Sequence, residues 1–370
     1  MKIAITGHTG FIGYHLKNTL LYQTLKSDIT LIDKDHFTSI EKLKKNLKNI
    51  DVLFHLAGIN RHDDKNYIYD ENVRLATVLI EAIEAINFDG KIVLASSTMV
   101  SHTTNYGKSK LRCTEIFDES SKKNSYKFSS LIIPNVFGQF CRPNYNSFIA
   151  TFCFNIINNI PVKVNNDKGV SLIYIDNLVK EFISEINNDY KTTSRRISAD
   201  IEISPKKVYN LLSSFEDVYI KNNLIPKFKS KFEESLFYTF ISYVDLKQYF
   251  PISHKKHTDK RGYFSEVIKL GGESQFSYSI TKKGITRGNH FHTRKIERFT
   301  VIKGKAQLNI RKIGTNNIIH FKIENTPQSV DMFPWFTHNI ENIGDEDLIT
   351  LFSVNEHFNE NDPDTYSEKV

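Results

Sequence analysis

The stretch Ile3-Ala4-Ile5-Thr6-Gly7-His8-Thr9-Gly10-Phe11-Ile12-Gly13 joins an apolar run to a glycine-rich turn. The apolar run predicts a buried strand, and the spacing of the glycines predicts a turn that opens a helix. Glycines let backbone N–H groups approach a pyrophosphate at the N-terminus of such a helix. Asp33 follows about 20 residues later, at the end of the next apolar run, as a dinucleotide-binding motif requires. We therefore expect a dinucleotide site with contacts from Gly7, Gly10, Phe11 and Gly13.

Short apolar runs alternate with helical patterns from residue 1 to about residue 180. The segment Asn72–Ile86 has one apolar face, which is typical of a helix that packs on a sheet. The apolar runs are nearly continuous, which is typical of parallel strands that are buried on both faces. This alternation predicts an α/β, Rossmann-like fold with a doubly wound parallel sheet. The expected strands are Ile3–Thr6, Ile29–Asp33, Val52–His55, Ile92–Ser96 and Ser130–Ile133.

The pattern changes after Pro251, where short strand-like runs recur between glycine or asparagine turns. Such a pattern is typical of an all-β barrel or jelly roll. Residues 180–245 are expected to be mostly helical and irregular and to lie on the substrate side. We expect a dinucleotide-binding domain at residues 1–246 and a β domain at residues 247–370. The expected strands of the β domain are Tyr263–Ile268, Phe276–Thr281, Glu297–Ile302, Ala306–Ile313, Ile318–Ile323 and Leu348–Val354.

The composition excludes several classes of protein. The chain has 370 residues, 40% of them hydrophobic, which suits two folded domains. No apolar stretch approaches the roughly 20 residues of a membrane helix, so we expect no membrane insertion. Three cysteines without CxxC spacing, and no leader before the first strand, predict a cytoplasmic protein. The formal charge of +7 is scattered, which predicts no nucleic-acid partner but suits a phosphate-bearing small molecule.

A second motif, Asn105-Tyr106-Gly107-Lys108-Ser109-Lys110, predicts a catalytic pair. Tyr106 and Lys110 are four residues apart, so both side chains lie on one face of a helix. A lysine ammonium beside a phenol lowers the pKa of the phenol, which can then exchange a proton near neutral pH. Ser97 follows the fourth expected strand and could donate a hydrogen bond to the same substrate oxygen. Thr98 is the alternative, because the interval to Tyr106 is short.

Most of residues 1–180 resembles the extended short-chain dehydrogenase/reductase superfamily. His55-Leu56-Ala57-Gly58 is similar to the segment that lines the adenine and ribose side of its cofactor site. Asn72-Val73, with Thr77, is similar to its central helix. Pro134-Asn135-Val136-Phe137-Gly138 and Tyr174-Ile175-Asp176-Asn177 resemble its nucleotide-sugar region.

This resemblance assigns roles to the motifs. It implies that Tyr106 is the general acid, that Lys110 positions the nicotinamide ribose, and that Ser97 polarises the carbonyl group. It also implies cofactor contacts and a substrate contact, and it implies a nucleoside-diphosphate sugar as the substrate. The implied cofactor contacts are Ala57 and Gly58, and the implied substrate contact is Asn135.

The residues leave the choice between NAD(H) and NADP(H) open. Asp33 favours NAD(H), because its carboxylate can accept a hydrogen bond from the ribose hydroxyl. The neighbouring Lys34 and His36 could instead meet the 2′-phosphate of NADP(H).

A set of metal-ligand residue types marks the second half of the chain. His290 and His292 are two residues apart, so on a strand both point to the same side. Glu297 lies a short turn further on, and His338 comes from a distant segment. Three imidazoles and a carboxylate suit zinc or another divalent first-row ion. Together with Gly284 and Gly304, the spacing of these residues resembles the first cupin motif. This resemblance implies a cupin jelly-roll barrel. The second cupin motif is only partly kept, around His338.

The same region also resembles the dTDP-4-keto-6-deoxysugar epimerases, which are metal-free cupins. The resemblance rests on the segments from Asp259 to Glu266 and from Lys283 to His290. It implies a base role for His290, which conflicts with a role as metal ligand. His292 stands where glutamine is usual in those epimerases, and we therefore favour the ligand role. Arg261 and Arg287 are candidate anchors for the diphosphate or the sugar oxygens.

The whole chain resembles the CapF/WbjC family of capsular and O-antigen biosynthesis. Segments at residues 141–153 and 361–366 add to this resemblance. It implies a bifunctional homodimeric enzyme on the path to UDP-N-acetyl-L-fucosamine, in which the cupin domain epimerises C3 of UDP-2-acetamido-2,6-dideoxy-hexos-4-ulose. The N-terminal domain would then reduce the C4 ketone with NADPH to the L-talose-configured product. Two alternatives stay open: an NAD-retaining dehydratase or C4-epimerase with a structural cupin, and a non-catalytic sensor of nucleotide and metal.

Overall fold

The computed structural model of the chain describes residues 1–22, 28–164, 167–254, 257–259, 262–264, 274–356 and 359–370. The chain forms two compact units. The first comprises residues 1–152 and 163–208, and the second comprises residues 153–162 and 209–370. The contacts within the chain thus place residues 209–246 in the second unit, whereas the sequence places them in the first domain. The predicted boundary between the two functional domains, at residues 246/247, stays a prediction.

The first unit is built on a parallel sheet, as predicted. In the described part of the chain the sheet has six strands in the order β2-β1-β3-β4-β5-β8. All five predicted strands are present, within three residues of their expected bounds. Most of their side chains are buried because helices cover both faces. The strands are β1 (Lys2–Thr6), β2 (Asp28–Ile32), β3 (Val52–His55), β4 (Lys91–Ser97), β5 (Lys127–Ile133) and β8 (Thr192–Arg196).

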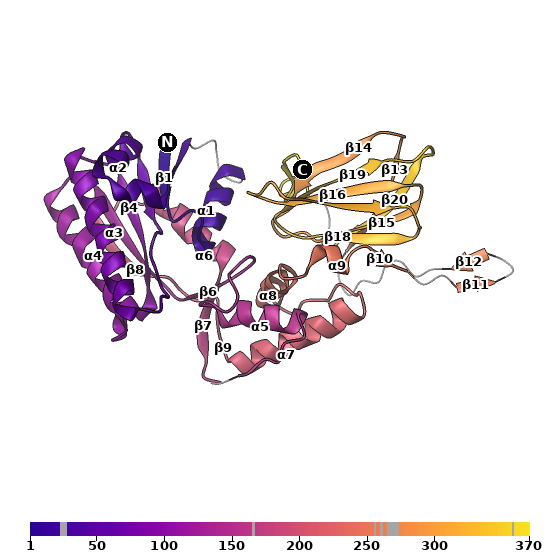
Figure 1. Ribbon diagram of the computed structural model, residues 1–370, viewed down its shortest axis with the longest axis horizontal. Coiled ribbons are helices and arrows are strands. Elements are labelled where there is room, and N and C mark those ends of the chain that lie inside the picture. The colour runs from indigo at the N-terminus through magenta and orange to yellow at the C-terminus, as the bar shows by residue number, and fades with distance from the viewer. Residues whose placement is uncertain (23–27, 165–166, 255–256, 260–261, 265–273, 357–358) are drawn as a thin grey trace. The chain divides into compact units, whose positions relative to one another are not determined.

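Helices lie on both faces of this sheet (Figure 1). Helices α2, α3 and α4 contact one another on one face, and α1 contacts α6 on the other. Helix α3 begins seven residues before the predicted Asn72, because the side chain of Asp64 caps it by accepting a hydrogen bond from the backbone of Asn66. The bounds are α1 (Phe11–Tyr22), η1 (Lys34–Thr38), α2 (Ile40–Leu47), α3 (Lys65–Ala85), η2 (Thr98–Ser101), α4 (Asn105–Lys123), α6 (Ile175–Ser184) and η3 (Glu185–Asn187).

A small sheet and two further helices complete the first unit and lead into the second. The sheet orders its three described strands as β6-β7-β9. Helices α5 (Phe148–Ile157) and α7 (Pro205–Phe215) each cross a division between the two units. The strands of the small sheet are β6 (Asn135–Phe137), β7 (Val170–Tyr174) and β9 (Ile201–Ile203).

The second unit contains the predicted all-β domain. Two antiparallel sheets, each with five described strands, have the orders β10-β18-β15-β20-β13 and β17-β16-β19-β14-β21. Phe299 of one sheet packs edge-to-face on His338 of the other, so the two sheets face each other. The strands of these two sheets are β10 (Ile252–Ser253), β13 (Gln275–Thr281), β14 (Thr286–Phe291), β15 (Glu297–Lys303), β16 (Ala306–Lys312), β17 (Ile318–Ile323), β18 (Gln328–Met332), β19 (Phe336–Asn342), β20 (Leu348–Val354) and β21 (Tyr366–Ser367). Strands β11 (His257–Asp259) and β12 (Gly262–Phe264) pair with each other in a separate two-stranded sheet.

Helices precede the β domain in the second unit. They are the π-helical turn η4 (Glu216–Lys221), α8 (Lys231–Ile241) and α9 (Leu246–Tyr249). A buried network joins η4 to the barrel: the carboxylate of Asp331 accepts hydrogen bonds from the hydroxyl of Tyr219 at 2.5 Å and from the guanidinium of Arg298 at 2.7 and 2.9 Å. None of the described helices is long and apolar enough to cross a membrane.

Some sequence-based expectations differ from the structure. Residues 180–245 were expected to be helical and irregular, but they also contain β8 and β9. The predicted strand Tyr263–Ile268 lies partly outside the described residues. Its described part, Tyr263 and Phe264, belongs to β12. Five described strands of the two large sheets, β10, β14, β18, β19 and β21, were not predicted as strands, and neither was β11.

Candidate functional site

The predicted cofactor turn connects β1 to α1. Gly7 has a φ of +68°, and its carbonyl oxygen accepts a hydrogen bond from Gly10 at 3.0 Å. A Cβ on Gly7 would lie 2.6 Å from the backbone nitrogen of Ala57, and a Cβ on Gly13 would overlap the carbonyl of Gly7. Only glycine therefore fits at these two positions. Phe11 begins α1, so the turn presents the N-terminus of that helix beside the segment that contains Ala57.

A buried hydrogen-bond network holds this segment in place. The hydroxyl oxygen of Thr6 accepts hydrogen bonds from the backbone of Leu56 and Ala57, both at 3.1 Å. The same oxygen lies 2.9 Å from Nδ1 of His55, to which the hydroxyl donates. Burial, together with the charge of Lys110, lowers the pKa of His55 to about 3. His55 is therefore a neutral acceptor that ties the end of β3 to the end of β1.

Asp33, Lys34 and His36 lie together after β2. The carboxylate of Asp33 is 2.8 Å from Nε2 of His8, and the backbone of Asp33 donates to Nδ1 of His36 at 2.8 Å. Asp33 and Lys34 are exposed. His8 was missed by the sequence analysis, because it occupies one of the variable positions between the glycines. A carboxylate, an ammonium and two imidazoles thus lie at the place where the sequence predicts the ribose end of a dinucleotide.

The predicted catalytic pair lies at the start of α4. Thr104 caps this helix by accepting a hydrogen bond from the backbone of Gly107 at 3.1 Å. The buried Nζ of Lys110 donates to the carbonyl oxygen of Ala95 at 2.9 Å and lies 5.8 Å from the centre of the Tyr106 ring. Ser97, at the end of β4, is half-buried and accepts a hydrogen bond from the backbone of Met99. The structure thus brings Tyr106 and Lys110 together, next to the end of β4.

Asn72 connects this pair to the cofactor segment. Its side chain accepts a hydrogen bond from the backbone of Ile59 at 2.6 Å and donates to the carbonyl of Ile59 at 2.8 Å. It also donates to the hydroxyl of Ser109 at 2.9 Å. A Cβ on Gly58 would lie 3.4 Å from Nζ of Lys110. Asn72 was noted in the sequence only as part of a family motif, and its burial on α3 identifies it as a residue that orders the site.

Among the interactions of the described residues, none joins a predicted substrate contact to the Tyr106–Lys110 pair or to the predicted metal ligands. Asn135 is exposed on β6 and donates to the carbonyl of Ser171 at 3.5 Å. Arg287, on β14, donates to the hydroxyl of Thr281 at 3.1 Å and to the carbonyl of Ile280 at 3.3 Å. Arg261 lies outside the described residues.

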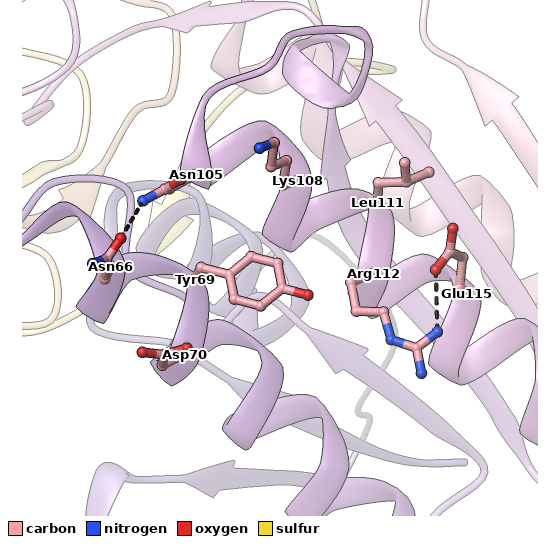
Figure 2. A pocket seen from close by; sticks show the side chains of 8 residues that line it. All are labelled: Asn66, Tyr69, Asp70, Asn105, Lys108, Leu111, Arg112 and Glu115. Carbon is pink, nitrogen blue, oxygen red and sulfur yellow. Dashed lines mark hydrogen bonds and ion pairs between the residues drawn. The ribbon is translucent and has the colours of Figure 1, made fainter.

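A groove of about 570 Å³ lies between α3 and α4 (Figure 2). Some of the polar side chains that line the groove bond to one another: Asn105 donates a hydrogen bond to Asn66, and Arg112 donates one to Glu115. None of the predicted site residues lines it, although Asn105 precedes Tyr106 in the chain. The groove is therefore distinct from the Tyr106–Lys110 pair. Its lining residues are Asn66, Tyr69, Asp70, Asn105, Lys108, Leu111, Arg112 and Glu115.

The four predicted metal ligands converge in the barrel. One ligand atom from each of His290, His292, Glu297 and His338 lies within 4.8 Å of the others. Oε2 of Glu297 is 3.2 Å from Nε2 of His292, 3.2 Å from Nε2 of His338 and 4.0 Å from Nε2 of His290. Three of these atoms, on His292, Glu297 and His338, are buried without a hydrogen-bond partner among the described residues. Buried polar atoms are rarely left without partners, so the arrangement fits a divalent cation.

A β-bulge directs the histidines inward. The register between β14 and β19 shifts between Gly288 and His290, and Gly288 and Asn289 have φ values of +99° and +63°. The Cβ of any other residue at position 288 would lie 2.8 Å from the carbonyl oxygen of His338. The bulge therefore requires glycine and re-aims His290 toward the other ligands.

The ionisation of His290 and Glu297 also suits a cation. Burial, reinforced by the neighbouring His338 and His292, lowers the pKa of His290 to about 4. Burial alone would raise the pKa of Glu297, but its contacts with His292 and His338 hold that pKa well below its usual range. Burial alone would lower the pKa of His292, but the carboxylate of Glu297, whose Oε2 lies 3.2 Å from Nε2, outweighs it and raises that pKa. The cluster thus holds a carboxylate and at least one neutral imidazole near neutral pH.

Comparisons with known proteins bear on both units. Residues 3–188 match the NAD dependent epimerase/dehydratase family, and residues 257–366 match the polysaccharide biosynthesis C-terminal domain. The chain is 30% identical over 373 residues to UDP-2-acetamido-2,6-beta-L-arabino-hexul-4-ose reductase of Pseudomonas aeruginosa, covering 100% of this chain and 99% of the relative.

Solved structures agree with these matches. The capsular polysaccharide assembling protein CapF from Staphylococcus aureus is 32% identical, with a TM-score of 0.62 and 100% of both chains covered. A complex of MoeE5 with UDP-glucose and NAD is 21% identical, with a TM-score of 0.52, and covers 59% of this chain and 82% of that one. The second likeness supports the fold alone.

Proposed function

The chain belongs to the NAD dependent epimerase/dehydratase family and, over its full length, to the CapF-like bifunctional UDP-sugar enzymes, and on this premise we propose two consecutive reactions for it. The β domain epimerises C3 of UDP-2-acetamido-2,6-dideoxy-hexos-4-ulose. The first unit then reduces the C4 ketone to the UDP-N-acetyl-6-deoxy-L-talose product. The observation that carries the proposal is the coexistence of a Tyr106–Lys110 pair in one unit and a four-residue metal cluster in the other.

The reduction uses residues at the start of α4. A bound nicotinamide dinucleotide supplies the hydride for C4. Tyr106 donates the proton to the resulting O4 alkoxide, and Lys110, whose ammonium donates to the carbonyl of Ala95, positions the nicotinamide ribose. Ser97 donates a hydrogen bond to the same oxygen, with Thr98 as the alternative. Gly7, Gly10 and Gly13 let the backbone approach the pyrophosphate at the N-terminus of α1.

We assign NADPH as the reductant, as the family resemblance implies. Lys34 and His36 are the residues that support this assignment, because both can meet a 2′-phosphate. Asp33 favours NAD(H) and supports the alternative, an NAD-retaining dehydratase or C4-epimerase. Net consumption of NADPH with the 4-keto sugar distinguishes the two functions, because a dehydratase or C4-epimerase regenerates its own cofactor.

The epimerisation uses the acidity of the C3 proton, which the adjacent C4 carbonyl provides. His290, His292, Glu297 and His338 would hold a divalent cation, which we propose to be zinc. The cation would polarise a substrate oxygen or stabilise the barrel. In this proposal His290 is a ligand and not the base, and Arg261 and Arg287 bind the diphosphate or sugar oxygens.

The proposal is tested by incubating the enzyme with the 4-keto UDP-sugar in D₂O, with and without NADPH, and analysing the products by NMR. The variant Tyr106→Phe should lose at least about 100-fold in the reduction rate, because it lacks the proton donor. Deuterium incorporation at C3 should continue at the wild-type rate. Loss of both activities together would contradict the two-site proposal.

We also propose that the enzyme is a cytoplasmic homodimer. Its three cysteines are all buried, as is common in reduced compartments. The edge strand β13 exposes Phe276, Tyr278 and Ile280, whose alternation along the strand places them on one face. An exposed apolar edge strand is a common interface between chains.

A further inference from the structure

The geometry points to Asp364 as a positioning residue for the metal ligands. It lies in the segment of residues 362–370, 72 residues after His292, the histidine that it contacts. This inference rests on the proposed function, because it assumes that His290, His292, Glu297 and His338 bind a cation. It adds a residue outside that set, whose carboxylate touches none of the four.

The carboxylate of Asp364 holds the loop between two proposed ligands. One oxygen accepts hydrogen bonds from the backbone and the hydroxyl of Thr293, at 3.0 and 2.6 Å. The other accepts from the backbone of Arg294 at 3.0 Å and of Lys295 at 3.2 Å. These three residues follow His292 directly and lead to Glu297. Asp364 is only 1% exposed, so the four hydrogen bonds, and not water, stabilise its buried carboxylate.

The backbone of Asp364 fixes the ring of His292. Nδ1 of His292 lies 2.5 Å from the carbonyl oxygen of Asp364, to which it can only donate. The proton on the neutral ring is therefore on Nδ1, and Nε2 is left with a lone pair directed at Glu297 and His338. This is the tautomer that a metal ligand needs, and a carbonyl partner on the other ring nitrogen is its usual support.

The conformation of Asp364 requires this support. Its φ of +42° is uncommon for a residue with a side chain, and aspartate tolerates it better than most. The carboxylate contacts and the carbonyl contact are made together in this conformation. A change that frees the carboxylate therefore also releases the carbonyl from His292.

Residues 366–368, which follow Asp364, hold the backbone around His290 in place. Strand β21 pairs with β14, so that Ser367 is opposite His290 and Tyr366 is opposite Phe291. The Tyr366 and Phe291 rings stack with their centres 5.3 Å apart. The backbone of Glu368 donates to the carbonyl of Asn289, in the β-bulge, at 2.9 Å. Residues 364–368 thus fix the backbone on both sides of the His290–His292 pair.

The test measures zinc affinity in the full chain, without substrate. Protein stripped with a chelator is titrated with Zn²⁺ against a chromophoric competitor. Asp364→Asn keeps the size of the side chain but places an amide NH₂ against backbone donors, so the zinc dissociation constant should rise about 10–100-fold. The matched control is Asp362→Asn, which removes an exposed carboxylate that pairs with Arg294; its zinc affinity should stay within about threefold of wild type.

Two further measurements exclude a purely structural role. The visible spectrum of the Co²⁺-loaded protein reports ligand geometry and should change in Asp364→Asn but not in Asp362→Asn. A structural role would lower the melting temperature and leave both the spectrum and the zinc affinity unchanged. If Asp364→Asn does not fold, Thr293→Val removes only one hydrogen bond to the carboxylate and should still weaken zinc binding at least threefold.

The outcomes separate this inference from the proposed function. If the wild-type chain binds no zinc, or if His290→Ala and His338→Ala bind it as wild type does, the metal site itself is wrong. If wild type binds zinc and His338→Ala does not, the metal site stands. If Asp364→Asn, or Thr293→Val in its place, then keeps the zinc affinity and the Co²⁺ spectrum of wild type, the positioning role of Asp364 is overturned.

Discussion

At the scale of single residues, charge and hydrogen-bonding type decide which ligand each unit can hold. Asp33 is the clearest case in the first unit, because in the proposed cofactor site its carboxylate would discriminate between two cofactors that differ by a phosphate. Its partner His8 lies 2.8 Å away and keeps the carboxylate oriented. The metal cluster is the corresponding case in the second unit, because its buried nitrogen and oxygen atoms have no other described partner.

The variant Asp33→Ser should change the preference between cofactors. A serine removes the charge that repels a 2′-phosphate and weakens the hydrogen bond to a ribose hydroxyl. The ratio of the NADPH to the NADH dissociation constant should therefore fall at least about tenfold, measured by fluorescence titration without substrate. Asp35→Ser is the matched control, because Asp35 is an exposed carboxylate two residues away. An unchanged ratio in Asp33→Ser would mean that Asp33 does not face the adenosine ribose.

At the scale of secondary-structure elements, the ends of β1 and β3 are joined through Thr6 and His55. The pKa of His55 is lowered to about 3 in the folded protein, against about 6.5 in an unfolded chain. Between these values the unfolded state binds a proton that the folded state does not. The free energy of unfolding should therefore fall as the pH falls below 6.5, by up to about 1.4 kcal/mol per pH unit from this group.

The variant His55→Asn should flatten that dependence. Asparagine keeps an acceptor near the position of Nδ1 but does not titrate. Urea unfolding between pH 6.5 and 4 should show a smaller slope of stability against pH than wild type, even though the variant is less stable throughout. The same substitution at the exposed His102 should leave the slope unchanged. Equal slopes for wild type and His55→Asn would show that His55 takes up its proton at the same pH in the folded and the unfolded protein, which would contradict the lowered pKa.

Elements also differ in how far the sequence predicts them. Five of the six described strands of the parallel sheet were predicted, because they are largely apolar. The sixth, β8, was not predicted, because Thr192–Arg196 is polar and only partly buried. Strands β14 and β19 were not predicted either, because they carry the polar side chains of the predicted ligands His290 and His338 on the inner face. The ligand types were recognised from their spacing, but the bulge at Gly288 and the contribution of Asp364 depend on contacts between distant segments. His8 and Asp364 have no local pattern that marks them.

At the scale of the whole molecule, the proposed function places two chemistries on one chain, and they would act on neighbouring carbons of one sugar. Epimerisation at C3 requires the C4 ketone, and reduction removes it. The order of the two reactions is therefore fixed by their chemistry, because a sugar reduced at C4 no longer has an acidic C3 proton. Tyr106→Phe should accordingly accumulate the epimerised 4-keto sugar, which is the observable that links the two units.

The association of two chains is the last property at this scale. The chain mass is 42.8 kDa, and the wild-type enzyme should sediment at about twice that mass. Tyr278 is 71% exposed on the edge strand β13, and a lysine there would bring a charge into an apolar contact. Tyr278→Lys should raise the dimer dissociation constant at least about tenfold in analytical ultracentrifugation, because tyrosines at the centre of an interface contribute strongly. Tyr190→Lys makes the same change at a tyrosine in the first unit that is 60% exposed, and it should sediment as wild type does. A dimer that survives Tyr278→Lys would place the interface on another surface, and a monomeric wild type would contradict the proposed dimer.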